Sequence, residues 1–244
     1  MSKVLLITGA SRGIGAATAK LAGTRGYDVA VNYLRDAGAA DEVVAAIKAS
    51  GQRAIAIQGD MAREEDVSRT FATIDRELGR ITHLVYNAGS TGGYSRLEDA
   101  DTAMMRSVLE LNVLGALMCA KAAAERMSTK KSSEGGAIVL ISSMAATLGS
   151  AGEYVWYAAS KGAIDSMTVG LSRELAAEGI RVNAVSPGRI ETGLHPPGRL
   201  ERLAPMMPIP RAGKPEEVAE AVLFLLSDAS SYTTGTNLRV SGGR

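Results

Sequence analysis

The stretch "KVLLITGASRGIG" (3–15) decides how the fold of this chain is interpreted. A short, mostly apolar run leads directly into a turn that carries Gly9, Gly13 and Gly15 in a GxxxGxG spacing. A buried strand that turns sharply into a helix needs glycine where the backbone bends and where side chains would block a close approach. The start of such a helix offers unpaired N–H groups and a positive dipole to phosphates. A strand–turn–helix without a ligand would also explain the motif, but its place at the first strand–helix junction favours a dinucleotide site.

Short apolar runs alternate with helical patterns along the rest of the chain. The runs are too continuously apolar for a sheet with one wet face, so both faces should be covered. The alternation predicts right-handed crossovers and an α/β fold, a doubly wound parallel seven-stranded sheet with helices on both faces. We expect strands at 3–7, 28–33, 53–58, 82–86, 137–142, 180–186 and 237–240, and helices at 36–49, 63–78, 101–127, 153–178 and 214–227.

Composition indicates one globular domain over 1–244. The chain has 46% hydrophobic residues and a net charge of +1. A net charge this small does not indicate binding to nucleic acid or to an anionic membrane. The N-terminal apolar run is too short for a signal peptide, and no apolar run approaches the roughly 18 residues of a membrane-spanning helix. The lone Cys119 fits a reducing compartment. We therefore expect a cytoplasmic protein. The Pro/Gly-rich stretch 186–215 is long for a connection and predicts a substrate lid within 189–210.

The end of the second strand bears on the choice between the two nicotinamide dinucleotides. An acidic residue there binds the ribose 2′-hydroxyl, whereas a basic one accommodates a 2′-phosphate. The expected acidic position falls near Tyr33, and Arg12 and Arg35 place positive charge nearby, which favours NADP(H) over NAD(H). Both arginines could instead be solvated surface residues, and Asp36 would reverse the preference if the register differs by a few residues.

The segment "YAASKGAID" (157–165) places Tyr157 and Lys161 on one face of an expected helix, since positions i and i+4 are neighbours there. An ordinary amphipathic face, with Tyr packed and Lys solvated, would explain an isolated pair. The functional alternative is an acid–base pair. A cation about 4 Å from the phenol, at an effective dielectric of about 20, interacts by about 4 kcal/mol. At about 1.4 kcal/mol per unit, it would lower the tyrosine pKa by up to about three units.

Two serines, Ser142 and Ser143, end a predicted central strand, at the edge where open parallel sheets bind ligands. A serine there could hold a carbonyl oxygen, or it could simply cap the following turn. A hydrolase with Ser143 as nucleophile is disfavoured because Ser143 does not stand at the centre of a GxSxG elbow. No metal is expected, since neither histidine has partners at metal-ligand spacing.

Taken together, these motifs resemble the classical short-chain dehydrogenase/reductases along nearly the whole chain. The matching segments, in the order typical of that family, are "TGASRGIG" (8–15), "NAG" (87–89), "LNVLG" (111–115), "ISS" (141–143), "YAASK" (157–161) and "SPGRIET" (186–192).

The resemblance implies a Rossmann fold and four catalytic residues. Tyr157 would be the general acid in reduction and the base in oxidation, and Lys161 would lower its pKa and hold the nicotinamide ribose. Ser143 would bind the substrate oxygen, with Ser142 as the alternative. Asn112 would anchor a water that relays protons to Lys161.

The resemblance also implies a cofactor cleft, with Asp60 facing the adenine. Combined with the glycine turn and the charges at the second strand, the expected cofactor-binding residues are Gly9, Ser11, Arg12, Gly13, Ile14, Gly15, Tyr33, Arg35, Asp60, Met61, Asn87, Ala88, Gly89, Tyr157, Lys161, Pro187, Gly188, Ile190 and Thr192.

Some positions depart from the family pattern. Ser143 and Tyr157 are fourteen apart, whereas the commonest separation is thirteen, a position that Met144 occupies here. One extra loop residue is easily absorbed, so Ser143 is retained. His83 replaces a frequent Asp and is interpreted as structural, and His195 as a solvated residue of the lid.

The expected function is NAD(P)-dependent hydride transfer between nicotinamide and a carbonyl or alcohol, on a small molecule such as a sugar, a 3-oxoacyl thioester or a ketone. The alternative is a catalytically silent dinucleotide-binding regulatory or scaffold protein on the same fold. Relatives form dimers through helices equivalent to 101–127 and 153–178 and a second interface through the C-terminal segment, so a homotetramer is implied. Met206, Met207, Leu194 and Trp156 suggest an apolar substrate wall, although they could equally belong to the core.

Overall fold

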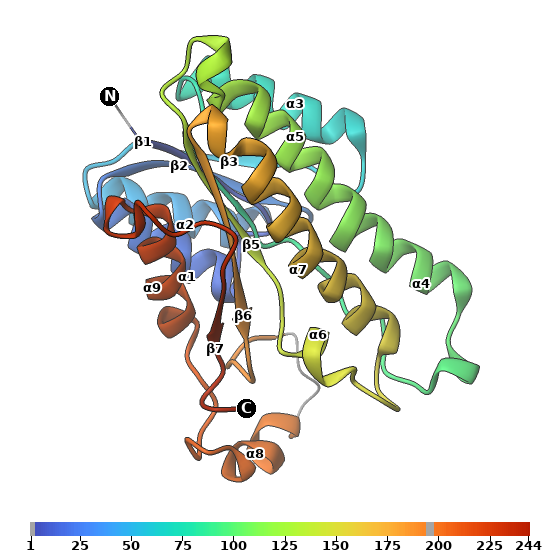
Figure 1. Cartoon of the computed structure of the whole chain (residues 1–244). Coiled ribbons are helices and arrows are strands. Elements are labelled where there is room, and N and C mark those ends of the chain that lie inside the picture. Colours follow the sequence, from blue (N-terminus) through green and yellow to red (C-terminus); the bar gives the residue numbers. More distant parts are fainter. Residues whose placement is uncertain (1–2, 194–197) are drawn as a thin grey trace.

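Seven parallel strands form one sheet in the computed structural model, which describes residues 3–193 and 198–244. The order is β3-β2-β1-β4-β5-β6-β7, and it reverses between β1 and β4 (Figure 1). Open parallel sheets bind ligands beyond the carboxyl ends of their strands at such a reversal. The predicted fold class is confirmed. The strands are β1 (Lys3–Ile7), β2 (Tyr27–Tyr33), β3 (Ala54–Gln58), β4 (His83–Tyr86), β5 (Gly136–Ile141), β6 (Ile180–Pro187) and β7 (Asn237–Val240).

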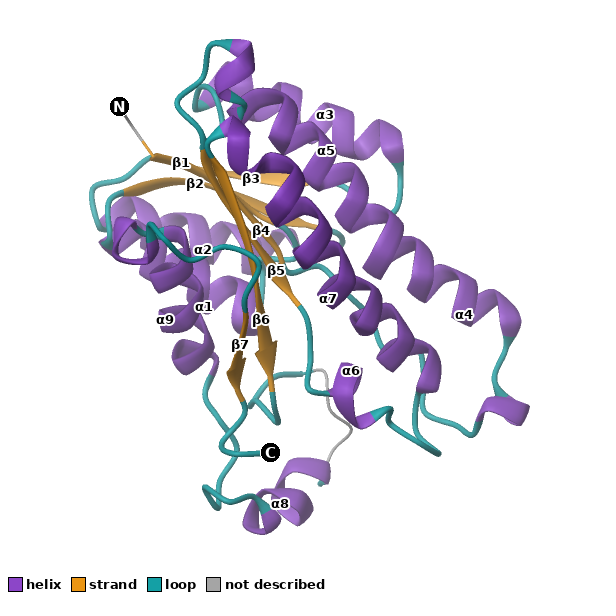
Figure 2. Ribbon diagram, viewed as in Figure 1, coloured by secondary structure: helices purple, strands orange, loops and turns teal. Residues whose placement is uncertain are grey.

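Helices cover both faces of the sheet, as the continuous apolar runs predict (Figure 2). Within β1, Leu5 and Ile7 join one core while Val4 and Leu6 join the other, because successive side chains of a strand point to opposite faces. One face carries α1 (Gly13–Thr24), α2 (Ala37–Ala49) and α9 (Pro215–Leu226), and the other carries α3 (Glu64–Glu77), α5 (Gly115–Met127) and α7 (Val155–Leu175).

The helix expected at 101–127 is interrupted. It consists of α4 (Thr102–Leu109), a π-helical turn (Glu110–Leu114) and α5. Single π-helical turns inside α-helices often occur at functional sites. Here the turn lets the Leu111 carbonyl accept a hydrogen bond from the Tyr86 hydroxyl at 2.5 Å.

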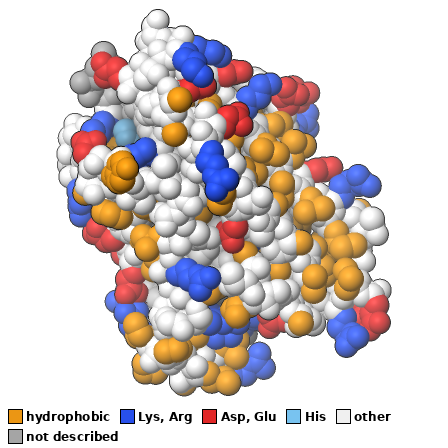
Figure 3. Space-filling view, viewed as in Figure 1, with side chains coloured by type: hydrophobic (Ala, Val, Ile, Leu, Met, Phe, Trp, Pro, Cys, Tyr) orange, Lys and Arg blue, Asp and Glu red, His pale blue; other side chains and the backbone are white. Residues whose placement is uncertain are grey.

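By length and composition alone, Thr102–Met127 could cross a membrane, with a mean hydropathy of 1.4 and 39% of that stretch buried. One such helix is weak evidence, because a helix packed on a sheet has the same composition. Cys119 and Ala123 are buried against the sheet, whereas Leu109, Leu114 and Leu117 are exposed. Figure 3 shows hydrophobic side chains gathered on this side of the molecule.

The carboxyl edge of the sheet is flanked by two short helices, α6 (Ala145–Leu148) and α8 (Arg199–Leu203) (Figure 1). The expected lid region leaves β6 and makes an isolated parallel bridge between Ile190 and Gly213. Leu194 and His195 lie outside the described residues.

Candidate active site

The glycine turn has the backbone geometry that its sequence predicts. Gly9 and Gly13 adopt positive φ angles of 61° and 55°, which favour glycine. A Cβ on Gly15 would lie 2.5 Å from the Gly9 carbonyl oxygen and 2.6 Å from Asn87 Nδ2, so any side chain there would force the turn apart. α1 begins at Gly13 with no acidic residue in its first turn, so its N-terminal dipole is not offset by a local carboxylate.

Asn87 and Thr8 join the ends of β1 and β4 at the reversal point. Asn87 Nδ2 donates to the carbonyl oxygens of Thr8 and Gly9 at 3.0 and 2.9 Å. The backbone N–H groups of Asn87 and Ala88 both donate to Thr8 Oγ1. These bonds account for the "NAG" segment as a brace that holds the glycine turn against the sheet.

The loop after β6 closes on the same turn from the other side. Thr192 lies so near Gly13 that a Cβ there would be 3.2 Å from Thr192 Cγ2. Pro187 ends β6, and a Cβ on Gly188 would lie 2.7 Å from the Ser241 Cα, so this loop must run close to the chain after β7.

Positive charge flanks the end of β2. Arg12 and Arg35 are exposed, Tyr33 packs partly against the core, and a groove beside α1 is lined by Ser11 and Arg12 among others. The Asp36 carboxylate accepts a hydrogen bond from Ala39 N at 3.0 Å and so caps α2. Asp36 therefore serves as the N-cap of α2.

Two residues after β3 differ in what they offer a cofactor. Asp60 is half-buried, and its carboxylate accepts a hydrogen bond from Ala62 N at 3.0 Å. The Met61 side chain is 2% exposed and lies in the core, with its sulfur 3.7 Å from Cys119 Sγ. The Met61 side chain is thus part of the core, which leaves its backbone to face a cofactor, and its expected role in cofactor binding stays a prediction.

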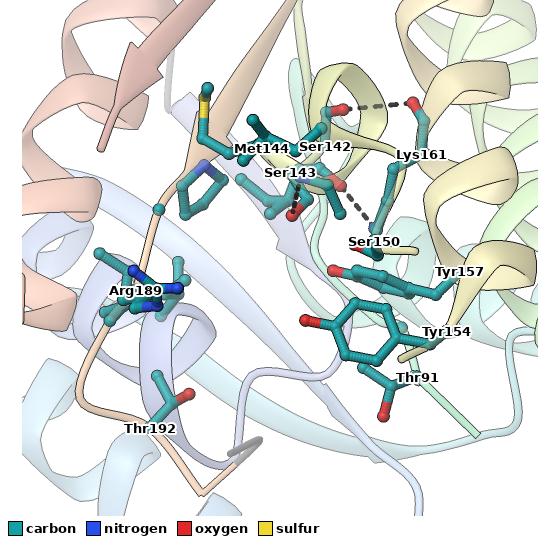
Figure 4. A pocket seen from close by; sticks show the side chains of 18 of the residues that line it. Thr91, Ser142, Ser143, Met144, Ser150, Tyr154, Tyr157, Lys161, Arg189 and Thr192 are labelled. Atoms are coloured by element: carbon teal, nitrogen blue, oxygen red, sulfur yellow. Dashed lines mark hydrogen bonds between the residues drawn. The ribbon is translucent and has the colours of Figure 1, made fainter. Parts of the chain in front are cut away.

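Tyr157 and Lys161 project together from α7, and both are almost fully buried (Figure 4). Lys161 Nζ donates to the Ile141 carbonyl oxygen at 2.7 Å and lies 5.7 Å from the centre of the Tyr157 ring. Burial lowers the pKa of Lys161 to about 8, opposed by the Asp165 carboxylate. Burial also raises the pKa of Tyr157 to about 12, and the hydrogen bond from Ser143 is the cause that opposes it.

The expected acidification of Tyr157 is therefore not present in this geometry. Desolvation of the phenol outweighs its neighbours, and Lys161, itself poorly solvated, is directed to a carbonyl of β5. Tyr157 is thus held in its protonated form, which is the form that donates a proton.

The two serines after β5 have different partners. Ser142 Oγ donates to Asp165 Oδ1 at 2.5 Å and contacts the Lys161 carbonyl oxygen at 3.2 Å. Ser143 lines the pocket beside Tyr157, whose pKa its hydroxyl lowers, and its Oγ accepts a hydrogen bond from Ala145 N at 3.1 Å. This arrangement gives Ser143, rather than Ser142, the hydroxyl that acts on Tyr157.

Asn112 lies fully buried in the π-helical turn. Its Nδ2 donates to the Ser90 carbonyl oxygen at 3.0 Å and to Ser160 Oγ at 2.9 Å, and its Oδ1 accepts from Ser90 N at 2.9 Å. Asn112 Oδ1 and Lys161 Nζ would lie 3.3 and 3.5 Å from a Cβ on Gly89, so both flank that glycine. The side chain fixes the loop after β4, and a water relay remains a prediction.

These elements enclose a pocket of about 130 Å³ at the carboxyl edge of the sheet (Figure 4). Of the expected site residues, the pocket brings together Ile14, Asn87, Gly89, Ser142, Ser143, Tyr157, Lys161, Pro187, Gly188, Ile190 and Thr192.

The sequence-based interpretation missed a second group of lining residues, which carry the aromatic rings and charges of the pocket. The apolar wall is also different from the one expected. Trp156 is buried and donates from Nε1 to the Thr91 carbonyl, and Met206 is 75% exposed, whereas Met144 and Leu148 line the pocket. The missed residues are Tyr94, Tyr154, Arg189, Arg199 and Arg244.

His83 starts β4, at the opposite end of that strand from the pocket. It is buried, its Nδ1 lies 2.7 Å from Thr82 Oγ1, and its ring packs edge-on against Tyr27. Burial lowers the pKa of His83 to about 4, so it is neutral, and its structural interpretation fits these contacts. Within residues 3–193 and 198–244, no three His, Cys, Asp or Glu side chains are grouped to hold a metal.

Comparison with known proteins assigns the family. A family model described as enoyl-(acyl carrier protein) reductase matches residues 9–244. The chain is 46% identical to the uncharacterized oxidoreductase YgfF of Escherichia coli (strain K12), over 99% of both chains. It is 39% identical to a 3-oxoacyl-(acyl-carrier-protein) reductase of Synechocystis, over 99% of this chain and 96% of that one.

A solved structure is also similar throughout. A short-chain dehydrogenase from Burkholderia cenocepacia J2315 in complex with NADP matches with a TM-score of 0.92 at 37% identity, over 99% of this chain and 97% of that one. The chain therefore belongs to the short-chain dehydrogenase/reductase family, whose fold it shares. Its activity is NAD(P)-dependent oxidoreduction.

Proposed function

We propose that this chain is an NADP(H)-preferring enzyme that interconverts a small carbonyl compound and its alcohol, with Tyr157 as the proton donor and acceptor. The observation that carries the proposal is that Ser143 and Tyr157 line one pocket, with Lys161 one helical turn further along α7 in the same pocket. A binding-only protein has no need for a buried phenol, hydroxyl and amine at one ligand edge.

The residues present fit a dinucleotide. Gly9, Gly13 and Gly15 leave a side-chain-free turn at the start of α1, where unpaired N–H groups suit a pyrophosphate. Arg12 and Arg35 supply charge suited to a 2′-phosphate, and Asp36 is engaged as a helix cap. The complex of the Burkholderia relative with NADP supports the same preference.

In the reductive direction, the bound nicotinamide supplies the hydride that adds to the carbonyl carbon. Ser143 Oγ donates a hydrogen bond to the carbonyl oxygen and orients it, and Tyr157 transfers its phenolic proton to that oxygen, leaving a phenolate. Lys161 stabilises that phenolate as an ammonium ion, with its position set by the Ile141 carbonyl. The raised pKa of Tyr157 keeps the acid protonated before the step.

We also propose the localisation, the domain organisation and the assembly of this enzyme. The chain is proposed to be one cytoplasmic domain with a lid within 189–210. The exposed apolar side of α4 and α5 suits a contact with a second copy, on the way to a tetramer. Static light scattering on the purified protein would give the assembly.

Tyr157→Phe tests the chemistry directly. General acid catalysis contributes roughly 10²- to 10⁴-fold, so kcat on any accepted carbonyl compound should fall by that factor while the Kd of NADPH changes less than about threefold. The measurement is NADPH oxidation over a panel of ketones and aldehydes, with cofactor titrated by fluorescence. NADP(H) should also bind more tightly than NAD(H).

Tyr154→Phe is the matched control, since Tyr154 lines the same pocket and its ring lies 5.4 Å from that of Tyr157. It should retain most of kcat. Equal turnover by Tyr157→Phe and the unaltered protein would refute the mechanism. If the protein binds NADPH but none of the carbonyl compounds supports NADPH oxidation, the silent-scaffold alternative is favoured.

A further inference from the structure

Three arginines gather on the side of the pocket where the substrate would lie. Arg189 follows β6, Arg199 begins α8 and Arg244 lies beyond β7, and all three line the pocket with Tyr157. Among the described residues, Glu153 is the one carboxylate that forms an ion pair with any of the three. Such an excess of positive charge is unusual in a pocket whose expected chemistry needs only a phenol, a hydroxyl and an amine.

Arg199 is held rigidly at the pocket. Its side chain is 10% exposed, and its guanidinium lies 5.2 Å from the Tyr94 ring centre and 5.8 Å from that of Tyr154. Nη2 donates to both Glu153 oxygens at 2.7 Å, while Nε is buried and has no hydrogen-bond partner among residues 3–193 and 198–244. One edge of the guanidinium is therefore satisfied, and another carries an unused donor.

Arg189 is even less compensated. Its Nη1 contacts the Met207 sulfur at 3.0 Å, a weak acceptor, and its Nε is buried without a partner. Burial and the repulsion of Arg244 and Arg199 lower the pKa of Arg189. Figure 4 shows Arg189 across the pocket from the hydroxyls of Tyr154 and Tyr157.

Both Nε atoms are enclosed by protein, so a ligand oxygen pairs with them only if the arginine side chains turn toward the pocket; such pairing would relieve the cost of a buried N–H group without an acceptor. Guanidinium groups match carboxylates in planar, two-bond geometry, which makes arginine the usual partner of a buried carboxylate. Arg189 and Arg199 line the same pocket as Ser143 and Tyr157.

We propose that the substrate is a small oxo acid, or the corresponding hydroxy acid in the reverse direction, whose carboxylate is bound by Arg189 and Arg199 while its carbonyl oxygen contacts Ser143 and Tyr157. This inference rests on the proposed function and names its substrate class. Both groups of such a molecule would find partners in one pocket, since Arg189 and Arg199 line it together with Ser143 and Tyr157. An oxoacyl thioester of a phosphate-bearing carrier also presents negative charge to the arginines. The test therefore includes one such thioester, acetoacetyl-CoA, as a separate compound.

The experiment compares matched substrates with NADPH present. The panel contains linear 2-oxo to 6-oxo acids and 4-oxocyclohexanecarboxylate. Each acid is assayed beside its methyl ester. At least one acid should exceed its ester in kcat/KM by roughly 10- to 100-fold, the range expected for hydrogen bonds to a charged group. Arg189→Leu should abolish that advantage mainly by raising KM, and Arg189→Lys should restore part of it.

The control is Arg76→Leu on α3, an arginine in an exposed ion pair with Glu77 that should leave the acid-to-ester ratio unchanged. Circular dichroism melts establish that each variant is folded. Equal kcat/KM for acids and esters throughout, or turnover of acetoacetyl-CoA alone at a rate insensitive to Arg189→Leu, would overturn the proposal while leaving the proposed enzyme activity intact.

A binding measurement separates the two proposals if nothing is turned over. Calorimetry on the NADPH-loaded protein compares cyclohexanecarboxylate with its amide. Tighter binding of the acid, lost in Arg189→Leu, supports the carboxylate site even if the enzyme proposal fails. Absence of any preference for the acid refutes the carboxylate site.

Discussion

The cofactor side of the cleft is formed mainly by backbone groups, whereas the substrate side is formed mainly by side chains. The side formed by the glycine turn consists of backbone groups braced by the Asn87 amide, with glycines where a side chain would collide. The side formed by α7, α8 and the loop after β6 consists of side chains, with aromatic rings and arginines facing Tyr157. Shape set by backbone tolerates almost no substitution, whereas a surface of side chains can change its ligand one residue at a time.

The largest effect should come from adding a side chain to the backbone side. A Cβ at position 15 would lie 2.5 Å from the Gly9 carbonyl oxygen, so Gly15→Val should either leave the chain unfolded or displace the turn. Overpacking of this kind costs about 1–3 kcal/mol or more, and NADPH affinity should fall at least about 100-fold. Thermal melts and fluorescence titration of NADPH measure both.

Gly162→Ala, on α7 with no atom near its missing Cβ, is the control that should be neutral or stabilising. Undiminished NADPH binding by Gly15→Val would show that the turn is not the rigid cradle described.

The second effect separates two adjacent serines on the side-chain side. Ser143→Ala removes the hydroxyl that lowers the pKa of Tyr157 and should lower kcat by roughly 10²-fold with little change in stability. Ser142→Ala removes the donor to Asp165 and should lower the free energy of unfolding by about 1–3 kcal/mol while sparing kcat. Steady-state kinetics and urea unfolding of both variants test the contrast, and the reversed pattern would make Ser142 the substrate-binding residue.

The smallest effect is a pH dependence where the two sides meet. If the Lys161 ammonium holds the cofactor ribose, kcat/KM for NADPH should fall as pH rises through about 8, up to tenfold per unit, because the free protein loses that proton there. Asp165 raises the pKa of Lys161, so Asp165→Asn should move the break to lower pH. A profile that is flat to pH 10 would contradict the expected role.

The lowered pKa of Lys161 also makes the stability of the fold depend on pH. The folded-state pKa of Lys161 is about 8, below its ordinary 10.5, so between these values the unfolded chain binds more protons. The contribution of Lys161 to the free energy of unfolding therefore rises with pH across that window.

The sheet and the backbone side of the cleft were predictable from sequence because their signals are local. Continuous apolar runs mark doubly covered strands, and Gly9, Gly13 and Gly15 mark a turn whose conformation needs them. The pairing of Tyr157 with Lys161 also followed from helical spacing alone. The position of Met61, however, depended on which way one side chain turned after β3, and spacing does not specify that.

The side-chain half was not predictable, because its contacts join distant segments. Glu153 and Arg199 are 46 positions apart in sequence, and their pairing depends on how α8 folds back over the pocket. The pKa of Tyr157 was misjudged for a related reason. A helical spacing gives the distance between two groups but not the water that burial removes from both.

The π-helical turn at Glu110–Leu114 has a consequence for sequence length. A π-helical turn accommodates one more residue than an α-helical turn, so α4 and α5 keep their faces in register only while that residue is present. Deleting one residue there would rotate every side chain on one side of the deletion by about 100° relative to the other. Asn112 and the exposed leucines of α4 and α5 would then face new surroundings together. Natural variants of this chain should accept substitutions in this turn at positions other than Asn112 far more readily than a change in its length.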